Sequence, residues 1–196
     1  LVEVFGFTSM AASRDAQRVA VLARSDPSAP EQLFLLEGPF DIEPDPWPMA
    51  LEPLAPPPKA DLLAPKRKTL AMFWSPDSLK LLALTSPGRE DLLTGKIEAG
   101  EGIRWEVTDV VSRRVTVFES VLPSAATLSS FLPFFDQYAL SQSLWAPDSQ
   151  SFCYAGKGID NQEGAWVQRL PERGQTDPPP PQLVVSGVQL VSWSPC

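Results

Sequence analysis

Residues 73–78 have the sequence Phe-Trp-Ser-Pro-Asp-Ser, and the apolar run Leu-Lys-Leu-Leu-Ala-Leu follows at 79–84. Proline presets φ at the second position of a turn, and the side chains of Asp and Ser hydrogen-bond to the nearby backbone. An apolar approach, such a turn and a second apolar run are typical of two antiparallel strands joined tightly. The stretch therefore predicts a β-hairpin.

The same motif recurs along the chain, once in full and twice in part. Leu-Trp-Ala-Pro-Asp-Ser lies at 144–149, Ser-Trp-Ser-Pro-Cys at 192–196 and a weaker copy, Ala-Ser-Arg-Asp-Ala, at 12–16. We number the motif from its Trp, so that residues 74–78 are positions one to five. When position two is aligned, the spacings are 62, 71 and 48 residues between Ser13, Ser75, Ala146 and Ser194. A core repeat of about 45 residues with variable insertions fits these spacings. The sequence thus predicts an array of repeats.

An all-β fold follows from the repeated unit. In its best-defined copy, apolar segments alternate with turns, and residues 103–108 alternate apolar and polar side chains as a half-buried strand does. Four such segments in succession predict an antiparallel four-stranded meander. We divide the chain into a degenerate first unit at 1–38, a proline-rich linker at 39–68, a second unit at 69–122, a connector at 123–142, a third unit at 143–187 and the opening strand of a further unit at 188–196.

The composition limits the class of protein. The chain has 196 residues, 43% of them apolar, which is enough for a hydrophobic core. Its formal charge is −8 and its one basic run is short, whereas phosphate binding needs clustered Lys and Arg. No segment approaches the roughly 20 apolar residues of a membrane-spanning helix. We expect neither a nucleic-acid partner nor a transmembrane segment.

The linker is rich in proline. Nine of the 27 residues at 39–65 are Pro, a density that disfavours both helix and strand pairing, so we expect an extended segment. Its Pro56, Pro57 and Pro58 are candidate partner-binding residues. Acidic residues from Asp41 to Glu52 imitate the spacing of a calcium loop, but Pro46 stands where that loop needs Gly, so we predict no metal there.

Four aromatic residues of the connector have helical spacing. They are candidate partner-binding residues: Phe131, Phe134, Phe135 and Tyr138. One interpretation is an amphipathic helix that presents them to a partner. The interpretation we favour is a short turn that packs on its own core, because Pro133 limits any helix.

The motif resembles the blade motif of TolB-like, or PD40, β-propellers, which are relatives of WD40 proteins. The resemblance rests on residues 74–78 and 145–149, each followed by a strand and then by a Trp-bearing segment. It implies twisted four-stranded blades whose indole rings fill the wedge between neighbours. The residues with this structural role are Trp74, Pro76, Asp77, Trp145, Pro147, Asp148 and Trp193.

Two departures from the family motif stand out. Ser78 and Ser149 replace the usual Gly, which a turn tolerates only if φ there stays negative or strain is accepted. The first unit has lost both Trp and Pro. TolB-like proteins point to an exported, lumenal or organellar compartment, although related propellers also occur in the cytosol.

The predicted propeller is incomplete within this chain. Three blades and one opening strand do not close a ring, since propellers need about four to eight blades. The exposed blade edge must therefore be covered by the remainder of a larger propeller, by a partner chain or by a second copy. We favour a partner or a remainder over self-pairing.

Residues for common enzyme chemistry are missing from the sequence. There is no His, which removes the usual general base, the Ser-His-Asp arrangement and zinc sites other than pure Cys or carboxylate ones. We expect no catalytic residue, no metal and no cofactor. The favoured function is a non-enzymatic interaction or scaffold subunit of a larger assembly. The alternative is the propeller portion of a hydrolase or glycosidase whose catalytic part lies elsewhere.

Overall fold

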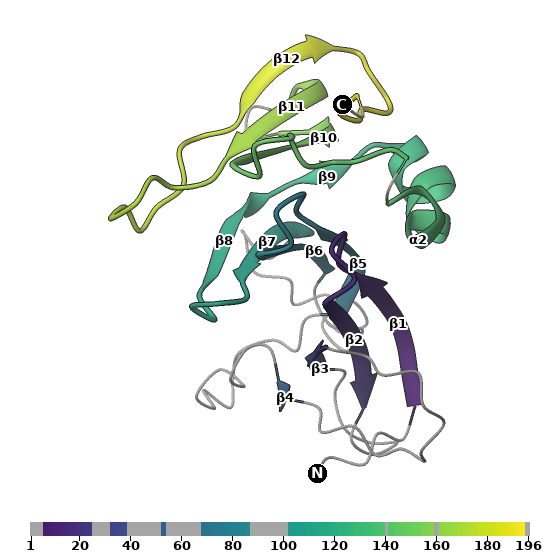
Figure 1. The fold of residues 1–196 in the computed structure, drawn as a ribbon. Coiled ribbons are helices and arrows are strands. Elements are labelled where there is room, and N and C mark those ends of the chain that lie inside the picture. Colours follow the sequence, from purple (N-terminus) through teal and green to yellow (C-terminus); the bar gives the residue numbers. More distant parts are fainter. Residues whose placement is uncertain are drawn as a thin grey trace.

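The computed structural model describes residues 6–24, 32–38, 52–53, 68–86, 102–139, 141–158 and 161–194. These residues are mostly β-strand and form three antiparallel sheets of four strands each (Figure 1). The first sheet contains β1 (Gly6–Ala12), β2 (Arg18–Arg24), β3 (Gln32–Glu37) and β4 (Glu52–Pro53). The second contains β5 (Lys68–Trp74), β6 (Lys80–Ser86), β7 (Arg104–Asp109) and β8 (Val115–Ser120). The third contains β9 (Leu122–Pro123), β10 (Ser151–Lys157), β11 (Glu163–Arg169) and β12 (Gln182–Ser186).

Within each sheet the strands pair in chain order, as a meander does. The first strand of the first two sheets carries an irregularity at the same place. Thr8 in β1 and Leu70 in β5 fall between paired residues, each four positions before the last residue of its strand. The first two sheets therefore share a detail of register that their sequences do not reveal.

The third sheet departs from this plan along the edge of β10. The C-terminal end of β10 pairs with β9, where Gly156 lies opposite Pro123. Near the N-terminal end of β10, Phe152 forms a bridge with Trp145. A helical segment lies between the two pieces of this edge. It consists of the π-helical turn η1 (Thr127–Phe131), the 3₁₀ turn η2 (Leu132–Phe134) and the helix α2 (Phe135–Tyr138).

The sheets pack face to face in sequence, as Figure 1 shows from purple to yellow. The largest buried cluster joins the second and third sheets and is rich in aromatic rings: Phe73, Trp105, Phe118, Trp145, Phe152, Tyr154 and Trp166. A smaller cluster joins the first and second sheets through residues that include Leu22, Met72 and Trp74. Burial of large apolar side chains, at about 2 kcal/mol each, is the main force that holds the sheets together.

The strand pattern of the second unit agrees with the sequence prediction of four antiparallel strands. The first sheet takes its fourth strand, β4, from within residues 39–68, which the sequence predicts to be a linker. Residues 188–194, predicted to open a further unit, form no strand. Most of the proline-rich linker, with Pro56, Pro57, Pro58 and the residues from Asp41 to Pro46, lies outside the described residues.

Leu82 offers a test of the packing between the second and third sheets. Its side chain is fully buried, and we expect Leu82→Ala to lower the free energy of unfolding by about 3 kcal/mol because a cavity remains. Leu122→Ala is the matched control, because Leu122 is 55% exposed and should cost less than about 1 kcal/mol. Urea unfolding of both variants measures the difference. Equal losses would contradict the assigned packing.

Candidate functional site

The three motif turns have the same backbone hydrogen bonds. In the second sheet the Ser75 N–H donates to Lys80 C=O at 2.9 Å, and the Ser78 N–H donates to Ser75 C=O at 2.9 Å. The corresponding bonds occur in the first and third turns: Ser13 to Arg18, Ala16 to Ser13, Ala146 to Ser151 and Ser149 to Ala146. The weak copy at 12–16 therefore folds as a complete motif turn.

The motif aspartates act within their own turns. Oδ1 of Asp77 accepts the Leu79 N–H at 3.0 Å, and Oδ1 of Asp148 accepts the Gln150 N–H at 2.8 Å. Asp15 accepts the Gln17 N–H in the same way at 3.0 Å. Such bonds fix the turn. The structure thus places these carboxylates as turn-forming groups.

The fifth motif residue has a left-handed backbone in all three turns. Its φ is 54° at Ala16 and 58° at both Ser78 and Ser149. The sequence leaves two possibilities at Ser78 and Ser149, a negative φ or a strained backbone. Because φ is positive at both serines, these turns accept the strain. A side chain at such a φ costs about 1 kcal/mol relative to Gly, which raises the question of what the serine provides.

The serine hydroxyls bind the preceding turn. Oγ of Ser149 accepts the backbone N–H of Asp77 at 3.1 Å, and Oγ of Ser78 accepts the backbone N–H of Asp15 at 3.3 Å. Both serines are buried, with 1% and 2% of their surface exposed. Gly could not make this bond, so the hydroxyl gives a physical reason for Ser at a position that favours Gly.

The motif tryptophans make a second bond to the preceding sheet. The indole N–H of Trp74 donates to Ala11 C=O at 2.8 Å, and that of Trp145 donates to Phe73 C=O at 3.0 Å. Each acceptor is the residue before the first motif position of the preceding turn. We use the word junction for this pair of contacts, one from an indole and one from a hydroxyl, between successive turns.

A third junction is present in part. Trp193 takes the indole position, and its backbone N–H donates to Ser143 C=O at 2.8 Å. Its indole N–H is buried without a hydrogen-bond partner among the described residues, a property it shares only with Trp105 in the aromatic core. Among the described residues no side-chain hydroxyl accepts the backbone N–H of Asp148, whereas Ser78 and Ser149 accept the corresponding N–H groups of Asp15 and Asp77. The third turn therefore offers a junction that this structure leaves incomplete.

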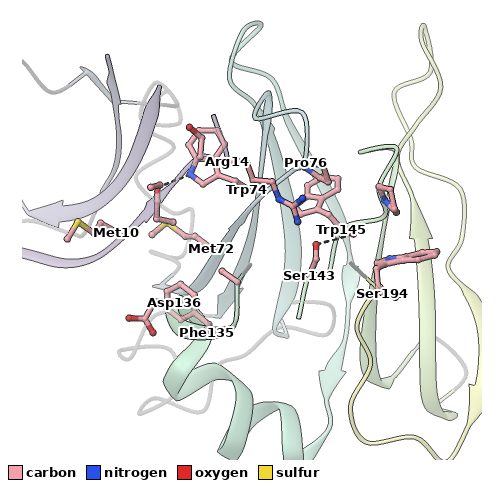
Figure 2. Close-up of a pocket in the computed structure, with 16 residues that line it drawn as sticks. Met10, Arg14, Met72, Trp74, Pro76, Phe135, Asp136, Ser143, Trp145 and Ser194 are labelled. Atoms are coloured by element: carbon pink, nitrogen blue, oxygen red, sulfur yellow. Dashed lines mark hydrogen bonds between the residues drawn. The ribbon is translucent and has the colours of Figure 1, made fainter. Parts of the chain in front are cut away.

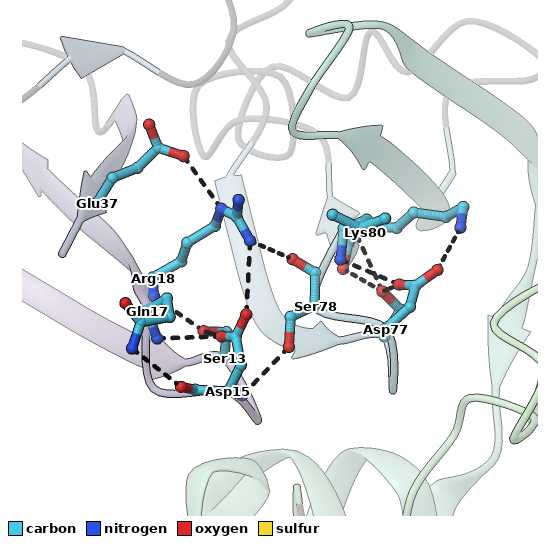
Figure 3. A network of polar contacts seen from close by, with 10 residues as sticks. Ser13, Asp15, Gln17, Arg18, Glu37, Asp77, Ser78 and Lys80 are labelled. Atoms are coloured by element: carbon cyan, nitrogen blue, oxygen red, sulfur yellow. Dashed lines mark hydrogen bonds and ion pairs between the residues drawn. The ribbon is translucent and has the colours of Figure 1, made fainter. Parts of the chain in front are cut away.

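A polar network reinforces the first junction (Figure 3). The Arg18 guanidinium donates from Nε to Oε1 of Glu37 at 3.0 Å and from an Nη to Ser78 C=O at 3.2 Å. Lys80 Nζ lies 2.9 Å from Asp77 Oδ2 within the second turn. The Arg18 side chain thus links the first sheet to the second turn.

A cavity of about 620 Å³ lies where the turns converge (Figure 2). Most of its wall is apolar, from the methionines, the motif tryptophans and the motif prolines: Met10, Met72, Trp74, Trp145, Trp193, Pro76 and Pro147. Arg14 is the one cationic side chain among its lining residues, and Asp136 the one acid. Arg14 holds the motif position that Pro76 and Pro147 hold in the other two turns. The cavity is thus lined by the motif itself.

The aromatic residues of the helical segment fall into two groups. Phe131 is buried and stacks on Phe73, with ring centroids 5.7 Å apart, and on Tyr138 at 6.0 Å. Phe135 meets Phe73 edge to face at 5.7 Å. Phe134 is 46% exposed. Three of the four candidate residues therefore pack on the chain's own core, and Phe134 alone faces outward.

Two motif aspartates have a lowered pKa. Burial raises the pKa of Asp77, but hydrogen bonds from Ser75, Lys80 and Leu79 outweigh it, so the pKa lies below the ordinary 3.8. The hydrogen bond from the Ser13 hydroxyl is the main cause that lowers the pKa of Asp15. Both groups favour the charged form when the turns are folded.

The buried titratable groups of the third sheet are held neutral. Burial raises the pKa of the Cys153 thiol from 9.0 to about 12, and burial also raises the pKa of Tyr154. A thiol is a nucleophile only as its thiolate. Cys153 is therefore an inert core residue at neutral pH.

The part of the chain that the structure describes contains neither a cluster of metal-ligating side chains nor a membrane-spanning helix. There, no three side chains of Asp, Glu, His or Cys lie close enough together to hold a metal ion. None of the described helices has the length and apolar character needed to cross a membrane. When the chain is compared with known proteins, no family model matches it and no curated protein matches it.

Exchanges at the fifth motif position separate the hydroxyl bond from backbone strain. Ser149→Ala keeps the strain and loses the bond, so we expect a loss of about 1 kcal/mol in the free energy of unfolding. Ser149→Gly should lose less, because Gly relieves the positive φ. Ala16→Gly is the matched control, since it relieves the same strain with no hydroxyl to lose, and it should stabilise. A Ser149→Ala protein as stable as the wild type would contradict the junction.

The lowered pKa of Asp77 predicts acid sensitivity. A carboxylate with a depressed folded pKa contributes stability above its unfolded pKa, and this is lost as the pH falls through the folded pKa. We expect the free energy of unfolding to fall below pH 3.8 and to fall less in Asp77→Asn. Urea unfolding at neutral and acid pH measures this, with Asp177→Asn in an exposed loop as the control. An unchanged pH profile in Asp77→Asn would refute the assignment.

Proposed function

We propose that this chain is a non-enzymatic interaction or scaffold subunit, built as part of a β-propeller, whose third sheet holds a further sheet of the same repeat type within a larger assembly. The observation that carries the proposal is the incomplete third junction. Trp74 and Trp145 both use their indole N–H, whereas that of Trp193 is buried without a partner among the described residues. By the pattern of the first two junctions, the indole of Trp193 would donate to the Leu144 C=O of this chain, so the group that a further sheet must supply is a hydroxyl for the Asp148 N–H, as Ser149 supplies one for Asp77.

Exposed apolar side chains near this junction support the proposal. Val184 and Val185 on β12 are 59% and 51% exposed, and Leu190 in the following segment is 47% exposed. β12 is the outer strand of the third sheet, so one of its edges pairs with no described strand. An edge strand with exposed valines is a favourable place for another strand or sheet to associate.

The repeated junctions support a propeller frame. Successive sheets pack face to face, and their motif turns converge on one cavity. This is the arrangement that radial repetition of blades produces. In such a frame a fourth sheet would add a hydroxyl to the Asp148 N–H, as Ser149 does for Asp77.

A second copy of the chain would pack poorly on the outer face of the third sheet. The side chains that grip a preceding sheet are the Trp at the first motif position and the Ser at the fifth. The first sheet has Ala12 and Ala16 at these positions. Trp193 of this chain already takes the indole position at the third turn, and the first sheet of a second copy, docked head to tail, would not supply the hydroxyl. The chemistry therefore favours a partner chain or a remainder whose turn carries Ser or Thr at the fifth position.

The same groups argue for binding rather than catalysis. Asp77 and Asp148, the acids that a hydrolase would need in the motif, accept hydrogen bonds from their own turns. The Cys153 thiol is buried and protonated at neutral pH. These side chains therefore stabilise the turns and the core.

Site-specific cross-linking tests the proposed contact. We expect a photoreactive side chain at position 184 to cross-link a second polypeptide, or a segment of the same chain beyond residue 196, in cells of the source organism. Position 111 is the matched control, because Val111 is a valine that is 71% exposed but lies in a turn of the second sheet. Mass spectrometry of the product distinguishes the two sources.

Native mass spectrometry provides the opposing outcome. A folded monomer of 21.4 kDa that gives no cross-link at 184, or equal cross-linking at 184 and 111, would overturn the proposed function.

A further inference from the structure

The cavity at the converging turns has a property that sheet packing does not explain. Its wall combines three indole rings, two methionines and two prolines with a single guanidinium, that of Arg14. A volume of about 620 Å³ falls within the range of ligand pockets, roughly 300 to 1,000 Å³. An apolar pocket with one fixed charge is the usual form of a site for a small amphiphilic ligand.

The guanidinium of Arg14 has no structural partner among the described residues. No hydrogen bond or ion pair joins its guanidinium to any described residue, whereas Arg18 four positions later has three such partners. Figure 2 shows the Arg14 side chain reaching from the first turn toward the turns of the other two sheets. It occupies the motif position that is Pro in both other turns, so the turn itself does not require a cation there.

The acid of the cavity wall does not neutralise this charge. Asp136 lies at the start of α2, and no ion pair connects it to Arg14. Its Oδ1 accepts the backbone N–H of Gln137 at 3.0 Å, and in Figure 2 its carboxylate points away from Arg14. The cavity therefore offers, beside aromatic walls, a cation that pairs with no described residue.

We propose that this cavity binds a carboxylate carried on an apolar body about the size of one aromatic side chain. The guanidinium of Arg14 would hold the carboxylate through two parallel N–H···O bonds, which is the geometry that Arg favours. Trp74, Trp145 and Met72 would enclose the apolar body. Two sources share this chemistry, a free aromatic or aliphatic acid and the C-terminus of a peptide that ends in an apolar residue.

Binding of matched acids and amides to the isolated chain tests the proposal. We expect phenylpropionate to bind at least about tenfold more tightly than its neutral amide, because a charge-assisted pair is lost in the amide. Acetyl-glycyl-phenylalanine with a free or an amidated C-terminus forms the peptide arm. Tryptophan fluorescence and calorimetry give Kd, and the arm with the lower Kd identifies the source.

Arginine variants make the test decisive. Arg14→Gln should abolish the preference for acid over amide, Arg14→Lys should retain part of it, and Arg173→Gln, the same change in an exposed loop, should retain all of it. Arg14 is exposed and free of described partners, so Arg14→Gln should remain folded, which circular dichroism checks. Equal binding of acid and amide by the wild type, or an unchanged preference in Arg14→Gln, would overturn the proposal. These measurements need no partner for the third sheet, so their outcome is independent of the proposed function.

Discussion

The structure depends on one contact pattern, in which side chains of each turn hold the backbone of the turn before it. The indoles of Trp74 and Trp145 donate to carbonyls of the preceding strand, and the hydroxyls of Ser78 and Ser149 accept backbone N–H groups of the preceding turn. Because the preceding unit contributes only backbone atoms to these indole and hydroxyl bonds, its motif side chains are free to vary. This freedom explains how Ala12-Ser13-Arg14-Asp15-Ala16 can lack Trp and Pro and still adopt the full motif turn.

The sequence was sufficient to predict the local structure of the repeats, because Pro, Asp and period-two alternation act over a few residues. It predicts the antiparallel strands of the second unit and the hairpin turns of the second and third units. It did not predict that β9 would share the edge of β10 with residues near Trp145, because that pairing spans the helical segment. The sequence leaves the sign of φ at Ser149 open, since the hydroxyl that compensates a positive φ bonds to a residue 72 positions away.

The candidate cavity shows a different limit of sequence interpretation. The sequence predicts a structural role for the motif tryptophans and prolines, and in the structure the same side chains also line the cavity. Arg14 is not among the site residues that the sequence predicts, because its motif lacks the Trp and Pro of the other copies. The sequence nevertheless contains a usable signal. Position three of the motif is Pro in two copies and Arg in the other, which indicates that the turn does not require a particular side chain there. Only the convergence of three turns in space places that exception beside the indoles.

The direction of the junction contacts has a consequence for how the protein is made. Synthesis proceeds from the N-terminus, so the backbone of a finished hairpin is always available before the Trp and Ser that grip it emerge. Each new unit can therefore nucleate on the exposed face of its predecessor, with short-range turns forming first and sheet packing following. The long segment between the first and second motifs then delays only the next addition and leaves completed units undisturbed. The polarity of the junction thus suits vectorial folding during translation.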